Sequence, residues 1–498
     1  MFNLIDEPWI PVASSNVSSK LASISDVLLK PHRWSRIQSI NPIECLALHR
    51  LLLAICHRAI GPGDLSQRIA LIDDWPNDQI RSYLDLWRHR FELHDPQRPF
   101  LQYPGLADAG AKPKPWTILC PDRASGSNRV FWDHSTDSDI QPISRAEAAV
   151  ALIAHLQFAP CGLVKFLRTS ASASPSTGPL LVIPTGNTLQ ETFVLSLVEQ
   201  TAAEFEIDLP GWEVPLPSIT ELEKPTPFVI AGPAQRYTFM PRMVELLPAA
   251  QITHVFYAPG FLPADSPIPD PMTAVVIREN GLQMPLMLNQ NKAIWRDLHA
   301  LIGAEGSHSP ETVSNAASIQ DQRGIFEPIQ LTAGGLMTDK AKFLAWRLEF
   351  RNISPRLLSQ QNAIYVVEKL LQTADLTGKL MRKALWALFS NWLSHNGTGS
   401  SPETSSVRGM LDSTQVMTHF WAALESDFWS LVNCLGSGVD GDEILSRWNT
   451  TLSISVSKTW DQAREYLGLD SRALMAAAQS SAALGRALKP LQTSLSTD

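Results

Sequence analysis

The stretch LLSQQNAIYVVEKLLQTADLTGKLMRKALWALFSNWLSH, residues 357–395, opens the region that decides the fold. Its apolar residues recur at intervals of three and four, which predicts a long amphipathic helix, with a break near Asp375 to Gly378 as an alternative. Similar patterns follow at roughly 406–435, 442–467 and 470–492. Helices joined by short connections form antiparallel bundles. We therefore predict a C-terminal four-helix bundle over residues 346–498.

The sequence before residue 346 has a different pattern of apolar residues. Short apolar segments such as 180–184 alternate with proline-rich loops, and they are typical of strands. Helical spacing occurs at 41–59, which a capping asparagine opens, and at 143–158, which begins with the spacing of a capping box. Residues 1–345 are predicted to form a mixed α/β domain with long loops, so the fold class of the whole chain is α+β.

The composition limits the function classes. The chain has 498 residues, 44 % of them hydrophobic, and a net charge of -8 from 41 basic and 49 acidic side chains. These values describe a globular protein with a large core and exclude wholesale disorder. Proteins that bind nucleic acid by bulk charge are usually basic. Any nucleic-acid contact therefore has to come from a local patch or from an assembly that supplies positive charge.

The cysteines and the N-terminus indicate the compartment. Five cysteines occur at wide spacings without a CxxC pair, which argues against a disulfide framework or a zinc ribbon. The start, MFNLIDEPWIPV, carries acids where a signal peptide carries basic residues, and no apolar run of about 18 residues follows. We expect a cytoplasmic protein with no membrane span.

No enzymatic constellation stands out, because HExxH, GxSxG and GxGxxG are all absent. Three weaker candidates for a chemical site have simpler interpretations. TGK at 377–379 fits a helix, His94–Asp95 fits a polar turn, and Cys56–His57 fits the apolar core. An acidic loop is suited to a hard cation but is more typical of a solvated loop; its residues are Asp133, His134, Asp137 and Asp139. We predict no catalytic activity, no metal and no cofactor.

The segment AGGLMTDKAK, residues 333–342, has the composition of a binding turn. Its two glycines permit close backbone approach, and Thr338 or Asp339 would cap a helix that begins at Lys340. A tight turn that presents two lysines is suited to a groove or a phosphate, although an ordinary turn before a helix looks the same. The candidate binding residues here are Gly334, Gly335, Thr338, Asp339, Lys340 and Lys342.

Two further segments are candidates for nucleic-acid contact. Lys379, Arg382 and Lys383 share one helix face by their spacing and could hold a phosphate backbone, although a solvated face is the simpler interpretation. The stretch SGSNRVFWDH, residues 125–134, places two aromatic residues after small flexible ones. Exposed aromatic rings in a loop can stack on bases, whereas buried ones pin the loop.

Taken in order, several segments resemble one family along essentially the whole chain. They are MFNLIDEPWIPV, RPFLQ at 98–102, SGSNRVFWDH, FAPCG at 158–162, GPLLVIPTGNTLQETF, WRDLHALI at 295–302 and AGGLMTDKAK, followed by the helical bundle. The chain resembles the large-subunit (CasA) family of the type I-E CRISPR Cascade complex. The resemblance implies a non-enzymatic subunit of an RNA-guided assembly that reads the protospacer-adjacent motif (PAM) from the minor groove and wedges the strands apart.

The resemblance also implies partners. These are the CRISPR RNA, double-stranded target DNA, the other Cascade subunits that form the backbone, bind the handle or are small, and a helicase-nuclease recruited later. The division of labour is that of other RNA-guided systems, in which protein reads the PAM and base pairing reads the sequence.

Residue roles carry over by position. Asn128 and Phe131 match a loop that reaches toward the RNA handle and a neighbouring subunit. The PAM loop corresponds to Ala159, Pro160, Cys161 and Gly162, with one glycine where members often have several. The hairpin after Gly334 and Gly335 matches the wedge, with Lys340 at the position of a wedge glutamine in some members. Arg242 is the candidate for a basic finger in the minor groove.

Two competing hypotheses remain. A nucleic-acid-modifying enzyme would need a metal or nucleophile cluster, and the acidic loop at 133–139 is its only support. A structural adaptor without DNA contact would tolerate charge changes at the basic candidates. The segment 163–178, low in apolar residues, is expected to become ordered only on assembly.

Overall fold

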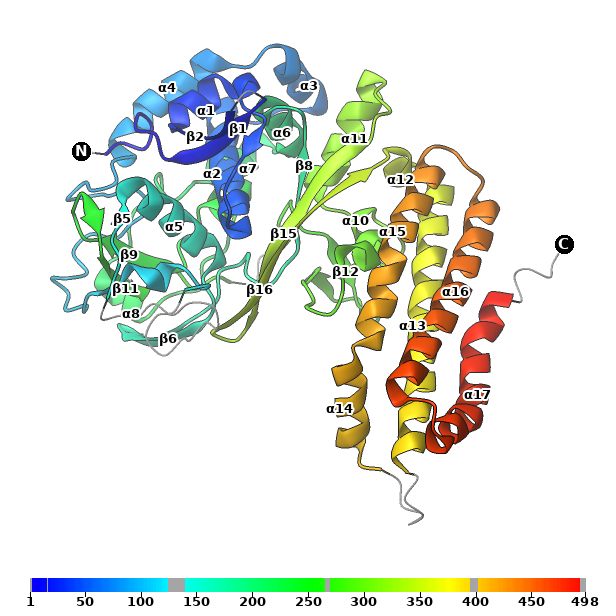
Figure 1. The fold of residues 1–498 in the computed structure, drawn as a ribbon. Helices are drawn as coiled ribbons and strands as arrows, with labels where there is room; N and C mark the ends of the chain where they lie inside the picture. Colours follow the sequence, from blue (N-terminus) through cyan, green and yellow to red (C-terminus); the bar gives the residue numbers. More distant parts are fainter. Residues whose placement is uncertain (1, 16, 124–138, 265–268, 395–401, 493–498) are drawn as a thin grey trace. The chain divides into compact units, whose positions relative to one another are not determined.

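The computed structural model describes residues 2–15, 17–123, 139–264, 269–394 and 402–492. The chain forms two compact units (Figure 1). The N-terminal unit comprises Met1–Gln290 and Gly306–Asn352, and the helical unit comprises Asn291–Glu305 and Ile353–Asp498. The predicted domain boundary after residue 345 falls inside a strand that runs to Ile353, and the helical unit also includes a segment from far upstream.

The helical unit confirms the predicted bundle. Its long helices are α13 (Gln361–Leu393), α14 (Thr404–Thr414), α15 (Val416–Gly436), α16 (Gly441–Leu467) and α17 (Ser471–Gln492). The short elements η4 (Ile294–Asp297), α10 (Leu298–Leu301) and α12 (Arg356–Ser359) complete it. The second pattern divides into two helices because Gln415 adopts a left-handed conformation with φ 50°. The first pattern stays unbroken through Gly378.

An aromatic cluster binds the upstream segment to the bundle. Trp295 of η4 is fully buried, and its ring centroid lies 4.7 Å from that of Phe428 and 6.4 Å from that of Trp448. The Nε1–H group of Trp448 donates to the carbonyl oxygen of Leu370, at 2.8 Å. Large aromatic rings dominate core energetics, so η4 is part of the bundle core.

Gly378 explains why α13 lies so close to α15. A Cβ added at this glycine would collide with the indole ring of Trp421. We therefore expect Gly378→Ala to lower the free energy of unfolding by about 1 to 3 kcal/mol, the usual cost of overpacking a core. Urea titration followed by tryptophan fluorescence measures this cost. Gly409→Ala on α14, where a Cβ meets open space, is the matched control, and equal effects at both sites would contradict the packing argument.

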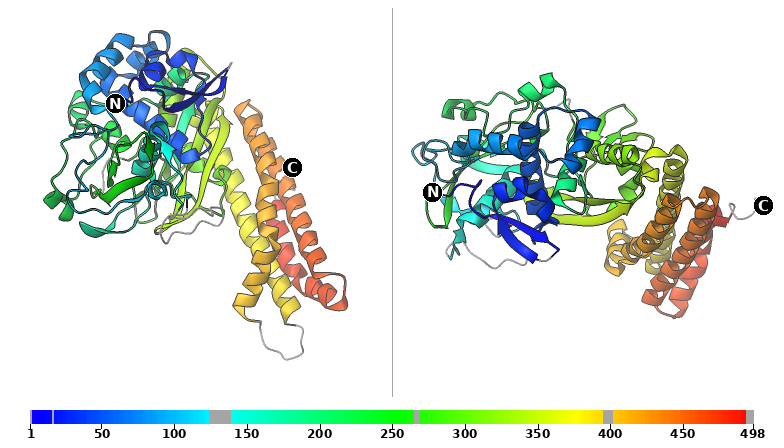
Figure 2. Two further views of the ribbon diagram at one scale, coloured as in Figure 1. Left: turned by 60° about the vertical axis from the view of Figure 1, so that its left-hand side comes forward. Right: turned by 90° about the horizontal axis from the view of Figure 1, so that it is seen from above.

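The N-terminal unit contains small sheets and short helices around one long, buried helix (Figure 2). Its helices are α1 (Ile24–Leu29), α2 (Pro42–Ile60), α3 (Leu65–Asp73), α4 (Asn77–Trp87), α5 (Arg145–Phe158), α6 (Leu189–Ser196), α7 (Ala202–Ile207), α8 (Ile219–Glu223), α9 (Pro233–Tyr237) and α11 (Glu311–Arg323), with 3-10 turns η1 (Pro31–Arg33), η2 (Arg88–Arg90) and η3 (Trp116–Leu119).

The strands form sheets of two or three members. The sheets are β2-β1-β3 (Val17–Ala22, Ile10–Ser14, Arg36–Ile37), β10-β5 (Gln251–Ile252, Ile143–Ser144), β4-β11-β9 (Lys114–Pro115, His254–Pro259, Arg242–Leu246), β13-β12-β14 (Gln283–Pro285, Val275–Ile277, Ser307–His308), β16-β15-β8 (Lys342–Ile353, Ile329–Asp339, Leu181–Thr185) and β6-β7 (Gly162–Phe166, Arg168–Ala171). Together with the helical unit, this mixture confirms the α+β class.

Helix α2 is the centre of the N-terminal core. The Asn41 side chain caps it by accepting from the Ile43 N–H group, as the sequence predicts, and the helix packs on α5 and α9. Arg50 within it is fully buried and pairs with Asp270 at 2.9 Å. In the described part of the chain no helix is both long and apolar enough to cross a membrane.

Candidate nucleic-acid interface

The lysine-bearing turn lies between two strands rather than before a helix. Strands β15 and β16 are neighbours in one sheet, and Lys340 and Ala341 form the turn that joins them (Figure 1). Lys340 adopts a left-handed conformation with φ 53°, and Asp339, Lys340 and Lys342 are exposed. The prediction of a helix from Lys340 is therefore wrong, because the aromatic and branched residues that follow favour a strand. We call residues 339–342 the hairpin tip.

The two glycines lie inside the sheet, away from this tip. Gly334 is buried, and a Cβ there would collide with the carbonyl oxygen of Arg347 on β16. A Cβ at Gly335 would lie 2.7 Å from the carbonyl oxygen of Pro179. Close backbone approach is thus used for sheet packing. The expectation that these glycines contact DNA is corrected, whereas Thr338 is half-buried at the base of the tip.

The predicted PAM loop lies next to the hairpin tip. Gly162 begins β6, and a Cβ added there would be 3.3 Å from the Cβ of Ala341. Pro160 and Cys161 are half-buried, whereas Ala159 is fully buried. The Ala159 N–H group donates to the Ser174 hydroxyl at 2.8 Å. Ala159 therefore anchors the loop from inside and presents no side chain to a ligand, which corrects its predicted contact role.

Sequence reasoning missed residues on the adjoining β6–β7 hairpin. Leu163 is 69 % exposed, and Lys165 is exposed with a left-handed φ of 58°. The segment 163–178, expected to order only on assembly, forms this hairpin and then a turn whose Thr177 pairs with Leu336 of β15. The pairing of β6 with β7 changes register between Leu163 and Phe166, and no pattern in the sequence predicts this change.

Arg242 supports this loop instead of contacting solvent. Its side chain is buried, with 1 % exposed, at the start of β9. Its Nη2 group donates to the carbonyl oxygen of Pro160 at 2.5 Å, and Nη1 donates to that of Ser172 at 2.6 Å. Its Nε–H group donates to the Tyr257 hydroxyl at 2.8 Å. The prediction of a basic finger at Arg242 is therefore wrong, because its donors are used within the fold.

The same network holds a neutral histidine. His155 lies 3.0 Å from the Tyr257 hydroxyl through Nε2 and 3.0 Å from the Leu119 carbonyl oxygen through Nδ1. Tyr257 accepts from Arg242, so it is free to donate to Nε2, and Nδ1–H donates to Leu119. Burial and then the nearby Arg242 charge lower the pKa of His155 to about 3.

This pKa shift predicts that the folded chain loses stability in acid. The unfolded chain binds a proton at His155 near pH 6.5, whereas the folded chain stays neutral, so the free energy of unfolding falls as the pH falls below about 6.5. One such proton contributes a slope of about 1.4 kcal/mol per pH unit between pH 6 and 4. Urea titrations across this range should show that His155→Gln has the shallower slope. Parallel slopes for both proteins would refute the assignment.

The remaining predicted residues fall in other places. Lys379, Arg382 and Lys383 are exposed together on one face of α13 in the helical unit, as their spacing predicts. Asn128 and Phe131 lie outside the described residues, as do Asp133, His134 and Asp137 of the acidic loop. Across the described residues, no group of three or more His, Cys, Asp or Glu side chains is arranged to hold a metal.

The weaker chemical candidates have structural roles. The Asp95 carboxylate accepts from the N–H groups of Gln97 and Arg98, which makes the His94–Asp95 pair a polar turn. Burial raises the pKa of the Cys56 thiol and lowers that of His57 to about 3. Both residues lie in the α2 core, as expected.

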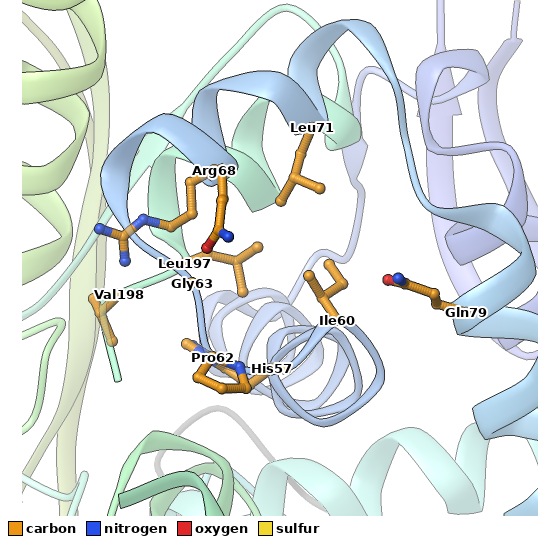
Figure 3. Close-up of a pocket in the computed structure, with 11 residues that line it drawn as sticks. His57, Ile60, Pro62, Gly63, Arg68, Leu71, Gln79, Leu197 and Val198 are labelled. Atoms are coloured by element: carbon orange, nitrogen blue, oxygen red, sulfur yellow. The ribbon is translucent and has the colours of Figure 1, made fainter. Parts of the chain in front are cut away.

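A cavity of about 230 Å³ lies beside His57 (Figure 3). Arg68 lines it too, but its side chain extends toward Val198, and its Nε and Nη1 atoms are shielded from solvent. The Nε2 atom of His57 is shielded in the same way. A ligand in this cavity would not reach these polar atoms, so we assign the cavity no function.

Comparison with known proteins agrees with this geometry. The family model "CRISPR-associated protein Cse1" matches residues 3–458. The chain is 33 % identical to the CasA/Cse1 protein of Thermus thermophilus, with 98 % of each chain covered.

Solved structures agree over the whole fold. The crystal structure of Thermus thermophilus CasA superposes with a TM-score of 0.86 at 31 % identity, covering 98 % of this chain and 99 % of that one. A Cse1 structure from Acidimicrobium ferrooxidans shares the fold, with a TM-score of 0.76 at 19 % identity over 99 % and 98 % of the two chains. The chain therefore belongs to the Cse1 (CasA) family of CRISPR-associated proteins.

Proposed function

We propose that this chain is the large, non-catalytic subunit of a type I-E RNA-guided surveillance complex, in which it reads the PAM on duplex DNA and starts strand separation. One of the similar chains, with a TM-score of 0.78 at 21 % identity over 97 % of this chain and 99 % of that one, comes from a structure named as a CRISPR RNA-guided surveillance complex. The complex would act in the cytoplasm and later recruit a helicase-nuclease.

One observation carries the proposal: the PAM loop and the hairpin tip are adjacent. Gly162 lies against Ala341, so a minor-groove reader and a wedge would meet the same base steps. The buried Arg242 fixes the Pro160 carbonyl oxygen and thereby the loop. Lys340 and Lys342 are exposed on the tip, where phosphates of a splayed duplex would pass.

The minor groove mainly distinguishes A·T from G·C pairs, so the PAM should be permissive. Wedge insertion costs a few kcal/mol for each unstacked step, which contacts to the opened strands and RNA–DNA pairing must offset. A net charge of -8 fits a subunit that binds DNA weakly by itself and strongly inside a complex that provides a basic channel.

The decisive experiment measures duplex binding by the RNA-loaded complex, with and without this chain, on targets with a randomised flanking motif. Selection of a few flanking sequences in the presence of the chain supports PAM reading. If the chain joins the complex without any flanking preference, it is a structural adaptor. Failure to join would refute the proposal.

The basic face of α13 gives a separate prediction. Replacing Lys379, Arg382 and Lys383 with glutamine should weaken duplex binding for all target sequences alike. Each lost phosphate contact should also reduce the salt slope of log K by about 1. The matched control replaces the exposed Arg408, Arg447 and Arg486 of other helices with glutamine. An unchanged salt slope would mean that this face does not contact the DNA backbone.

A further inference from the structure

The β6–β7 hairpin is held at both of its ends by one arginine. The Arg242 guanidinium donates to the carbonyl oxygen of Pro160, before β6, at 2.5 Å and to that of Ser172, directly after β7, at 2.6 Å. The inner side of the hairpin packs on the fold through Val164 and Ala171, which are both buried. Contacts to a ligand need side chains on rigid supports, and this hairpin provides such a support.

The outer side of the hairpin presents one large apolar side chain among basic and hydroxyl-bearing ones. Leu163 is 69 % exposed, and its strand partner on β7 is Ser170. Lys165, Thr169 and Ser170 are exposed as well. A single exposed leucine is ordinary on a protein surface. What distinguishes Leu163 is therefore its position.

Leu163 directly follows the residue at which the PAM loop meets the hairpin tip. A Cβ added at Gly162 would lie 3.3 Å from the Cβ of Ala341, which stands between the exposed Lys340 and Lys342. Proteins that kink DNA from the minor groove combine the same two kinds of side chain. An apolar group enters between two base pairs, and basic groups hold the phosphate backbone.

The sequence of the hairpin carries no acid that would repel a phosphate. No aspartate or glutamate occurs from Ala148 to Gln190, although the chain has 49 acids among its 498 residues. The same stretch contains Lys165 and Arg168. Such a hairpin permits close approach of a DNA backbone. A protein partner would require a wider apolar surface than one leucine provides.

Backbone strain is concentrated at the same place. Five non-glycine residues of the described chain have a left-handed φ, and three of them belong to these two adjoining hairpins: Lys165 at 58°, Leu167 at 56° and Lys340 at 53°. This conformation is unfavourable for residues with a Cβ atom, and it persists mainly where binding needs a fixed geometry. The strain therefore favours a binding role for the β6–β7 turn as well as for the tip.

We infer that Leu163 inserts its side chain at the base step beside the PAM, while Lys165 contacts a backbone phosphate of the same duplex. The strand-opening element then consists of two hairpins, with Leu163 as its apolar part and the lysines of both turns as its phosphate contacts. Leu163 acts on unstacking, and Lys165 acts on affinity for any DNA sequence. The inference rests on the proposed function.

Strand opening by the complete complex tests Leu163, with 2-aminopurine placed at the step beside the PAM. Leu163→Ala should slow opening at least tenfold on a fully paired target. On a target already mismatched at this step little unstacking remains, so the variant should match the wild type. Leu86→Ala, at a position 66 % exposed on α4, is the matched control and should match the wild type on both targets. Normal opening of the paired target by Leu163→Ala, or an equal loss on both targets, would overturn the inference.

The salt dependence of duplex binding tests Lys165. Lys165→Asn removes the charge and keeps a residue that tolerates a left-handed φ. It should weaken binding of all target sequences alike and reduce the salt slope of log K by about 1, whereas Leu163→Ala should leave the slope unchanged. An unchanged slope for Lys165→Asn would refute the phosphate contact.

The inference and the proposed function fail differently. A wild-type complex without flanking preference would contradict the proposed function, whereas a retained preference with normal opening by Leu163→Ala would overturn the inference alone. Because Leu163 is exposed, Leu163→Ala should unfold at the same urea concentration as the wild type, and Leu163→Met should keep fast opening. Weaker joining of Leu163→Ala to the complex would assign this leucine to a protein contact and overturn the inference.

Discussion

A complex that carries Lys340→Glu and Lys342→Glu together is expected to lose PAM-dependent strand opening by at least tenfold. Both lysines are exposed on the hairpin tip, next to the PAM loop, and the described residues give neither of them an ion-pair partner. Reversal of two charges replaces attraction to backbone phosphates with repulsion. A fluorescent base beside the PAM, with stopped-flow detection, measures the opening rate directly.

The matched control for this variant is Lys112→Glu with Lys224→Glu, which makes the same change in net charge at exposed sites away from the tip. Because the tip turn needs a left-handed residue at position 340, Lys340→Asn with Lys342→Gln is a second variant that removes charge and keeps a residue tolerant of that conformation. Equal opening rates for the charge-reversed tip and the control would refute a role for the tip in strand separation.

Arg242→Ala is expected to lower the free energy of unfolding by about 3 to 5 kcal/mol. The substitution removes the charged hydrogen bonds to the carbonyl oxygens of Pro160 and Ser172, whereas the Tyr257 hydroxyl keeps its hydrogen bond to His155. A hydrogen bond to a charged group contributes about 1.5 to 3 kcal/mol. Urea titration of the free chain gives this value. The loop at 159–162 loses its fixed position with the arginine, so PAM selectivity should weaken as well.

Two comparisons separate these effects. Arg168→Ala is the matched control, because among the described residues this half-buried arginine donates a hydrogen bond to one carbonyl oxygen, that of Gly260 directly after β11. It should cost about 1 to 2 kcal/mol and leave the loop in place. If Arg242→Ala keeps full PAM selectivity at a temperature where the chain remains folded, the arginine is required for stability alone.

The sequence predicts the elements that depend on local pattern and misses those that depend on tertiary contacts. The bundle follows from periodicity, the start of α2 from the capping Asn41, and the start of α5 from Ser144 and Glu147, which stand three positions apart. The bundle's upstream segment, Asn291–Glu305, could not be found this way, because its place depends on tertiary contacts such as the buried Trp295 ring and the ion pair between Arg296 and Asp375. Hydrophobic periodicity identifies the buried face of a helix, but it does not identify the segment that packs against that face.

The candidate interface shows the same division. The lysines of the tip and the basic face of α13 are exposed as predicted, because surface charge is readable from sequence. Arg242 looks like any other basic residue in the sequence, and only its burial and its hydrogen bonds to the carbonyl oxygens of Pro160 and Ser172 reveal its structural role. The glycines at 334 and 335 are read as a turn, whereas the sheet uses them for close packing. Spacing alone does not distinguish these two uses.

The interleaved order of the two units has a consequence for synthesis on the ribosome. Asn291–Glu305 emerges from the exit tunnel before any helix of its own unit exists, and β8 waits for β15, which follows that segment. The core of each unit therefore needs residues that are translated only after a segment of the other unit. Trp295 stays without its aromatic neighbours until α15 has been translated, and the last of them, Trp448, arrives only with α16. The nascent chain should accordingly remain a chaperone client for most of its translation time.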